Sequence, residues 1–229
     1  LDLKGKLLNV SASVLMGGTG KKEIDGYATG MYFTQKDDHA LLESILSEAN
    51  HYVDIGFEAL KIKIGKNIGF DRTLIKAMRQ TFSKLDLMAD SNHAYDYNEA
   101  IQIGRLLEKN SYTWFEEPLS PTQPKLMAEL VKKLDIAIAT GECEQTRWGF
   151  GMLLETNAAT ILQPDMAYCG GPTEALKIRA LASAKGINVI PHCWGTQLNL
   201  ACAAHFLATS IFSSDPTVPI TLQPKLLAH

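Results

Sequence analysis

Short runs rich in apolar and β-branched residues alternate with longer amphipathic runs from Glu23 onward. The short runs predict strands at Ile24–Ala28, Ala59–Ile64, Leu85–Asp90, Thr113–Glu116, Ile136–Thr140, Ile161–Asp165, Asn188–Pro191 and Ile220–Leu222. The longer runs predict helices, which include His39–Val53, Asp71–Phe82, Asn98–Glu108, Gln123–Lys133, Thr173–Ala184 and Gln197–Thr209. Strands joined through helices run parallel, because each helical crossover returns the chain to the same end of the sheet.

Eight parallel strands form either a wide open sheet or a closed barrel. Most of the strand runs are mixed or wholly apolar, as expected when helices cover the outside of a sheet and side chains fill the inside. A closed barrel leaves no unpaired strand edge, so an α/β barrel over residues 23–229 is the favoured fold. Residues 1–22 are predicted to be a helical segment that leads into the barrel, with one helix ending at Gly17-Gly18.

Composition and charge exclude several classes of protein. With 229 residues, 46% of them apolar and 21% charged, the chain can form a full core without disulfide or metal cross-links. Its net charge of −3 argues against sequence-independent nucleic-acid binding. No apolar run reaches the roughly 18 residues that a membrane helix needs. No signal peptide opens the sequence, and four cysteines without C-x-x-C spacing favour reduced thiols in a cytoplasmic protein.

Four carboxylates recur in step with the strands. Asp90, Glu116, Glu142 and Asp165 each lie at or just after the end of a strand candidate, at separations of 26, 26 and 23 residues. Parallel strand ends share one rim, and neighbouring strands lie about 4.8 Å apart, so the first three carboxylates are expected to converge. Three anions at one point need a cation, and an all-oxygen set favours Mg²⁺ or Mn²⁺. The alternative, that each acid caps the following helix, explains their matched phase less well.

Lys61 and Lys63 occupy alternate positions of the second strand and therefore share one face. A solvated face on an edge strand is the ordinary interpretation of such a pair. In a closed ring of eight strands that face points inward instead. Two ammonium groups held close disfavour each other's protonation, which would make a lysine usable as a base near neutral pH.

His192 follows the seventh strand, 27 residues after Asp165 and one strand–helix unit along. A carboxylate on the adjacent strand can accept the Nδ1 proton of the imidazole, which fixes the tautomer and raises the basicity of Nε2. The alternative is that His192 has only a structural role. Its spacing of one strand–helix unit from Asp165 favours a functional role instead. Cys143, Cys169 and Cys193 also follow strands and are interpreted as small apolar fillers rather than nucleophiles.

Together these motifs resemble the enolase superfamily, and more narrowly its mandelate racemase and muconate lactonizing enzyme branch. The resemblance is carried by Lys61-Ile62-Lys63, Asp90-Ser91-Asn92, Trp114-Phe115-Glu116-Glu117-Pro118, Gly141-Glu142, Gln163-Pro164-Asp165 and Pro191-His192. The opening Asp2-Leu3-Lys4-Gly5-Lys6 with Leu15-Met16-Gly17-Gly18 is similar to the segment that precedes the barrel in that family.

The resemblance implies a (β/α)₇β modified TIM barrel, with Mg²⁺ held by Asp90, Glu116 and Glu142. It further implies Lys63 as one acid/base, His192 paired with Asp165 as the other, Lys61 on the substrate carboxylate and Asn92 beside the metal.

Two departures from the family pattern stand out. The N-terminal α+β capping domain is largely absent from this chain, so the chain is either a fragment or a barrel with an open pocket. An uncovered apolar rim would favour a homo-oligomer. Gln223 stands where the branch usually has Glu, and an amide can donate a hydrogen bond but cannot give up a proton to a substrate.

The chemistry implied is abstraction of the proton α to a carboxylate through an ene-diolate, on a small-molecule substrate and without nucleic acid or membrane partners. Dehydration of a sugar acid is favoured, because residues 141–150 and 192–195 look most like acid-sugar dehydratases. Glu144, Arg147 and Trp194 are candidates for contacting substrate hydroxyls or a distal carboxylate, or else are rim residues without a ligand. The alternatives are a racemase or epimerase and a truncated, non-catalytic barrel.

Overall fold

The computed structural model describes residues 1–18, 23–209 and 220–222. The chain forms two compact units. The first unit comprises Leu1–Gly26, Gly141–Gly151 and Leu162–His229, and the second comprises Tyr27–Thr140 and Met152–Ile161. No helix of the described ranges combines the length and the apolar character needed to cross a bilayer.

The described residues alternate strands and helices in the predicted order. The strands are β1 (Gly26–Thr29), β2 (Ala59–Lys63), β3 (Asp86–Asp90), β4 (Trp114–Glu116), β5 (Ala137–Thr140), β6 (Ile161–Leu162), β7 (Asn188–Val189) and β8 (Ile220–Leu222). The helices are α1 (Asp2–Leu8), α2 (Ala12–Leu15), α3 (Asp38–Asp54), α4 (Ile68–Thr81), α5 (Tyr97–Lys109), α6 (Pro124–Lys133), α7 (Thr146–Thr156), α8 (Pro172–Ser183) and α9 (Gln197–Leu207). The α/β class with parallel strands is therefore confirmed, whereas barrel closure stays a prediction.

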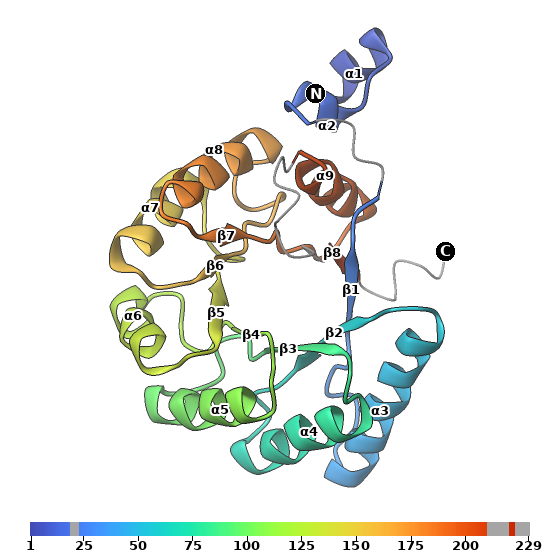
Figure 1. Cartoon of the computed structure of the whole chain (residues 1–229), viewed down its shortest axis with the longest axis vertical. Helices are drawn as coiled ribbons and strands as arrows, with labels where there is room; N and C mark the ends of the chain where they lie inside the picture. The colour runs from blue at the N-terminus through green and yellow to red at the C-terminus, as the bar shows by residue number, and fades with distance from the viewer. Residues whose placement is uncertain (19–22, 210–219, 223–229) are drawn as a thin grey trace. The chain divides into compact units, whose positions relative to one another are not determined.

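The second unit is built on a parallel sheet in which β1 to β5 pair in sequence order. Helices α3 to α6 cover one side of this sheet (Figure 1). The register pairs Lys63 with Asp90 and Asp90 with Glu116, which are the last residues of β2, β3 and β4. Backbone pairing alone thus aligns three of the predicted functional residues at one edge.

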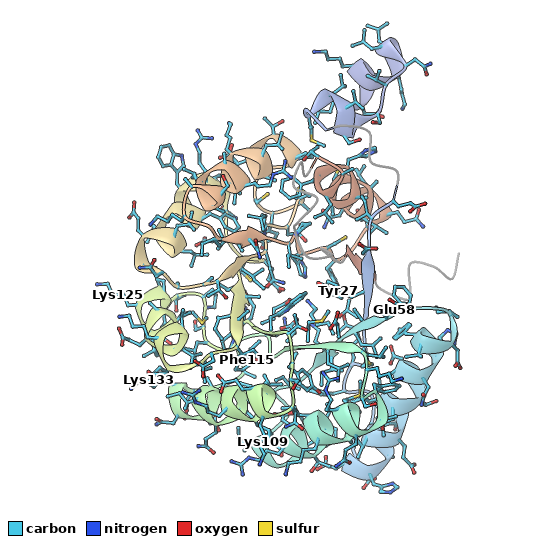
Figure 2. All side chains as sticks on the ribbon, viewed as in Figure 1. Tyr27, Glu58, Lys109, Phe115, Lys125 and Lys133 are labelled. Carbon is cyan, nitrogen blue, oxygen red and sulfur yellow. The ribbon has the colours of Figure 1, made fainter. Side chains whose placement is uncertain are left out.

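Apolar side chains between the strands and helices form the core of the second unit. Leu60 and Ile62 of β2 and Phe115 of β4 are completely buried. Burial of each such side chain contributes roughly 1.5–3 kcal/mol to folding. Phe115 lies inside the unit, whereas Lys109 and Lys133 lie on its outer helices (Figure 2). This pattern is the one expected of a sheet covered by amphipathic helices.

The loops after β2 and β3 pack closely against each other. Gly65 has a φ of +100°, and a Cβ placed there would lie 2.5 Å from the Cβ of Ala94 and 3.0 Å from the carbonyl oxygen of Ser91. The buried carboxylate of Asp71 accepts hydrogen bonds from the Tyr95 hydroxyl at 2.8 Å and from the Lys66 backbone N–H at 3.2 Å. These contacts join the segments that follow Lys63 and Asp90.

The N-terminal segment of the first unit corrects one prediction. The described residues of this segment contain α1 and α2, which are separate helices rather than the one helix predicted. Asn9 ends α1 in the left-handed conformation, with a φ of 53°, and Ser11 begins α2 by accepting a hydrogen bond from the Val14 backbone N–H. Both residues favour helix ends over helix interiors. In the same unit β6 and β7 pair through the Ile190 N–H and the Leu162 carbonyl, at 3.0 Å.

Candidate metal centre and acid/base groups

Two predicted metal ligands lie side by side in the second unit. Asp90 and Glu116 are partners in the register of β3 and β4, and both side chains are completely buried. Buried carboxylates need compensating positive charge or hydrogen-bond donors, because burial removes the water that stabilises the ionised form.

Lys61 supplies part of that compensation from β2. Its ammonium group contacts Oε1 of Glu116 and lies 3.8 Å from Oδ2 of Asp90. Burial alone would lower the pKa of Lys61, but the charge of Glu116, aided by Tyr27 and Asp90, raises it well above its ordinary range. Lys61 therefore stays charged in this structure, because the nearby anions outweigh its burial.

Lys63 lies two residues further along β2 and contacts the same aspartate. Its ammonium group donates to Oδ2 of Asp90 and, at 2.7 Å, to Oδ1 of Asn92. The backbone N–H of Asn92 donates to Oδ1 of Asp90 at 2.9 Å. Burial would raise the pKa of Asp90, but Lys63 and Lys61 together hold it below its ordinary value. Lys61 and Lys63 thus face the same side of the sheet, as their spacing predicts.

The residues present fit a divalent cation. Trp114 Nε1 donates to Oε2 of Glu116 at 3.0 Å, so both carboxylates are held in place by protein donors as well as by lysines. Oxygen ligands of this kind suit Mg²⁺, which prefers carboxylates together with water. Glu142 follows β5 in the chain and belongs to the first unit. Its assignment to the same cation stays a prediction.

The first unit contains the predicted histidine pair. Nδ1 of His192 lies 2.7 Å from Oδ2 of Asp165. A carboxylate accepts only, so this contact places the proton of the neutral ring on Nδ1 and leaves Nε2 for proton transfer. Nε2 lies 3.3 Å from Oε2 of Glu142. Burial would raise the pKa of Asp165, but donors that include His192, the Ala167 N–H and Asn199 lower it below its ordinary value.

The predicted substrate-binding residues differ in their surroundings. Arg147 donates to both carboxylate oxygens of Glu174 at 2.8 Å, so its guanidinium already has an anionic partner. The Glu144 carboxylate accepts from the Gln145 backbone N–H at 3.3 Å, and Trp194 is 61% exposed. Gln223 lies outside the described residues.

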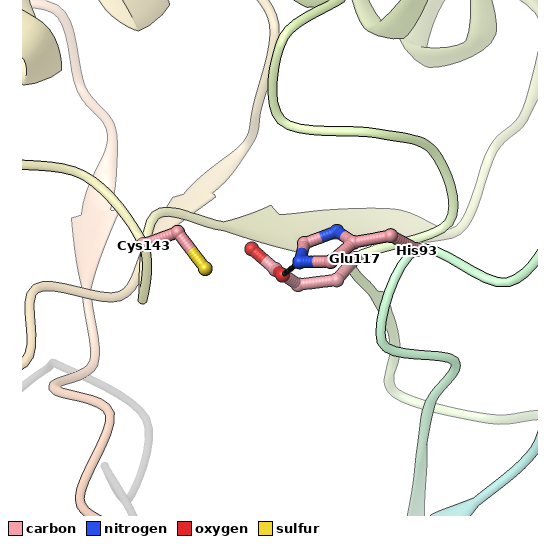
Figure 3. A group of neighbouring side chains, drawn as sticks. All are labelled: His93, Glu117 and Cys143. Atoms are coloured by element: carbon pink, nitrogen blue, oxygen red, sulfur yellow. Dashed lines mark ion pairs between the residues drawn. The ribbon is translucent and has the colours of Figure 1, made fainter.

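A second histidine pair, which the sequence analysis missed, lies in the second unit. His93 Nε2 contacts Oε2 of the completely buried Glu117, as Figure 3 shows, and its Nδ1 lies 3.1 Å from the Leu119 carbonyl oxygen. The Thr140 hydroxyl donates to Oε1 of Glu117 at 2.8 Å. The only sequence signal for this pair is its position, since His93 lies three residues after Asp90 and Glu117 directly follows Glu116.

Two of the cysteines are unsuited to act as nucleophiles. Burial raises the pKa of the Cys169 thiol to about 11 and that of Cys193 to about 12. A thiol must lose its proton to attack. Both residues therefore fit the interpretation as small apolar fillers.

Comparisons with known proteins agree with the geometry. Residues 44–218 match the family model described as enolase C-terminal domain-like. The chain is 36% identical over 224 residues to D-galactarolactone cycloisomerase of Agrobacterium fabrum, covering 97% of this chain and 58% of that protein. It is 34% identical over 209 residues to arabinonate dehydratase of Saccharolobus solfataricus, covering 90% of this chain and 55% of that protein.

A solved structure shows the same similarity. The crystal structure of 3,6-anhydro-D-galactonate cycloisomerase from Zobellia galactanivorans matches with a TM-score of 0.88 and 39% identity, covering 97% of this chain and 60% of that one. The chain thus spans somewhat more than half the length of these relatives. Since the family model extends over most of the sequence and the solved structure shares its fold, the chain belongs to the enolase C-terminal domain-like family of the enolase superfamily.

Proposed function

We propose that this chain carries the catalytic barrel of an acid-sugar enzyme that removes the proton α to a carboxylate. The observation that carries the proposal is the group of Lys61, Lys63, Asp90 and Glu116 on three adjacent strands, in which all but Lys63 are buried. Relatives named as an arabinonate dehydratase and a galactarolactone cycloisomerase support an acid-sugar substrate.

Asp90, Glu116 and Glu142 would hold Mg²⁺, or Mn²⁺ in its place. When bound, the cation would polarise the substrate carboxylate and stabilise the negative charge that develops on it. Lys61 would bind the same carboxylate. Its ammonium group stays charged and is held rigidly by buried partners, so it can stabilise developing charge without reorganisation.

Proton transfer is assigned to Lys63 and His192. The side chain of Lys63 is 14% exposed, against 2% for Lys61, so it is the more accessible of the two lysines. His192 has its Nδ1 proton directed at Asp165, which leaves Nε2 to take or give a proton. Lys63 ends the second strand and His192 follows the seventh, and we expect them to act on opposite faces of the substrate.

The fate of the intermediate decides the reaction class. Removal of the α-proton leaves an electron pair in an ene-diolate, which can expel the oxygen on the β-carbon once that oxygen is protonated. A free β-hydroxyl leaves as water, and tautomerisation of the resulting enol gives a 2-keto-3-deoxy acid. We favour this dehydration for the chain.

The cycloisomerase relatives support a second outcome of the same step. In a 3,6-anhydro acid the β-oxygen belongs to a ring, so its departure opens the ring and releases no atoms. Reprotonation of the same carbon would instead give a racemase or epimerase.

Incubation in D₂O with Mg²⁺ distinguishes these reactions. The panel is D-arabinonate, L-rhamnonate, D-galactonate and 3,6-anhydro-D-galactonate, followed by NMR and mass spectrometry. A keto product lighter by one water shows a dehydratase, and a keto product of unchanged composition shows a cycloisomerase. Deuteration at the α-carbon without a keto product shows an epimerase. Absence of exchange with every acid would overturn the proposal and favour a non-catalytic barrel.

A further inference from the structure

Asn199 is the residue through which α9 reaches the Asp165–His192 pair. It is the third residue of α9 and is 4% exposed. Its amide nitrogen lies 3.1 Å from Oδ1 and 3.0 Å from Oδ2 of Asp165, and 3.2 Å from the carbonyl oxygen of Trp194. All three partners accept only, so the amide is oriented with its NH₂ group toward Asp165.

Asp165 is held from several directions at once. The Ala167 backbone N–H donates to Oδ1 at 2.7 Å, and His192 Nδ1 lies 2.7 Å from Oδ2. Among the residues that the structure describes, Asn199 is the side chain that donates to both carboxylate oxygens. Rotation of the carboxylate would break these contacts, so Asn199 sets the plane in which Asp165 meets His192.

The oxygen of the same amide makes no comparable hydrogen bond among the described residues. Oδ1 of Asn199 is buried and has no hydrogen-bond partner in the described part of the chain. Burial of an amide oxygen without a donor is unfavourable, so packing alone would favour an apolar residue at this position. The contacts of its nitrogen therefore give the physical reason for an asparagine here.

We propose that Asn199 is a positioning residue that, through Asp165, holds the imidazole of His192 in its Nδ1–H tautomer with Nε2 available for proton transfer. The inference rests on the proposed function and adds to it a residue outside the predicted site. It assigns Asn199 no contact with substrate.

The test compares Asn199→Leu and Asn199→Asp with the unaltered chain. Leucine has the same branching pattern, and aspartate has nearly the same shape, but neither offers the NH₂ donor. Thr196→Ala is the matched control, because Thr196 caps α9 by accepting from the Asn199 backbone N–H at 3.3 Å and does not touch the amide. The readout is ¹⁵N and ¹H NMR of the His192 ring at about pH 8.5, where an ordinary histidine is neutral. Loss of these signals in His192→Gln assigns them.

The unaltered chain and Thr196→Ala should show the Nδ1–H tautomer with a slowly exchanging ring proton. Both Asn199 variants should show mixed tautomers and exchange of that proton on the order of tenfold faster. Unchanged His192 spectra in variants with native circular dichroism would overturn the inference. Loss of the fold in both variants would also overturn it, because Asn199 would then be needed for structure rather than for positioning.

Isotope exchange separates this inference from the proposed function. The probes are the C2-epimeric pairs D-arabinonate/D-ribonate and D-galactonate/D-talonate, with Mg²⁺ in D₂O. Asn199→Leu should slow α-proton exchange by about 10–100-fold for the epimer whose α-proton faces His192. For the epimer whose α-proton faces Lys63, the exchange rate should change by less than about twofold. An equal loss for both epimers contradicts the inference. Absence of exchange in the unaltered chain refutes the proposed function, while the NMR result still decides the role of Asn199.

Discussion

At the scale of single residues, the charge of Lys61 depends on its surroundings more than on its burial. Its side chain is 2% exposed, yet two carboxylates keep its pKa high. Sequence spacing predicted that Lys61 and Lys63 share a face but not the balance of charges around them. Likewise, His93 and Asn199 make their contacts with residues 24 and 34 positions away, so no local pattern marks them.

Replacement of Lys61 by Met should destabilise the metal-free chain by about 3–5 kcal/mol, because it leaves the buried Glu116 without the cation that contacts it, while Asp90 keeps Lys63. Urea denaturation measures the loss, and added Mg²⁺ should restore more stability to the variant than to the unaltered chain. Lys66→Met is the control: its partner Asp38 is largely exposed, and such pairs contribute about 0–1 kcal/mol. Equal effects of the two substitutions would contradict the charge balance described here.

The lowered pKa of Asp165 makes stability depend on pH. A carboxyl group whose pKa is lower in the folded than in the unfolded chain stabilises the fold above its unfolded pKa of about 3.9. That contribution is lost as the pH falls through the folded pKa. Denaturation curves from pH 6 to pH 3 should therefore show the unaltered chain losing its advantage over Asp165→Asn toward acid. A difference that is constant with pH would refute this assignment.

At the scale of elements, sequence patterns located the strands from β1 to β7 well because each of them is followed by a helix. Sequence patterns provided no bounds for α7, since its start lies in the polar stretch after Glu142 and two glycines flank Phe150. The division between α1 and α2 was missed as well, because a cap at Asn9 outweighs the continuing apolar pattern.

A side chain at Gly65, in the loop between β2 and α4, should destabilise the fold. Gly65→Ala combines a positive φ with a Cβ 2.5 Å from that of Ala94, whereas Gly56 has a φ of +102° and open space around its Cβ. Gly56→Ala therefore reports the backbone strain alone, about 1–3 kcal/mol. Thermal denaturation should show that Gly65→Ala is less stable than Gly56→Ala by about 1 kcal/mol. Equal losses would show that the two loops can move apart.

At the scale of the whole molecule, the predicted cation ligands are three acids that follow one another at intervals of 26 residues along the chain. Asp90 and Glu116 belong to the second unit and Glu142 to the first. The recurrence of acids at strand ends predicted this set, but a pattern along the chain cannot measure the distances between its members. Ligand-linked stability offers a direct test.

Mg²⁺ should raise the free energy of unfolding of the chain, by about 2.7 kcal/mol when its concentration is 100 times the dissociation constant. Glu142→Gln should reduce this gain while leaving the contact of Lys61 with Glu116 intact. Glu155→Gln, at an exposed position of α7, is the matched control. Thermal shifts with Mg²⁺ and with EDTA measure both, and an undiminished gain in Glu142→Gln would remove Glu142 from the ligand set.

The strand register described above also bears on how such a protein can be re-engineered. Lys63, Asp90 and Glu116 terminate adjacent strands, and backbone pairing fixes their mutual placement. Insertions or deletions further along the connecting segments would leave that alignment unchanged. Libraries could therefore vary those segments to bind other substrate acids while these three residues keep their places.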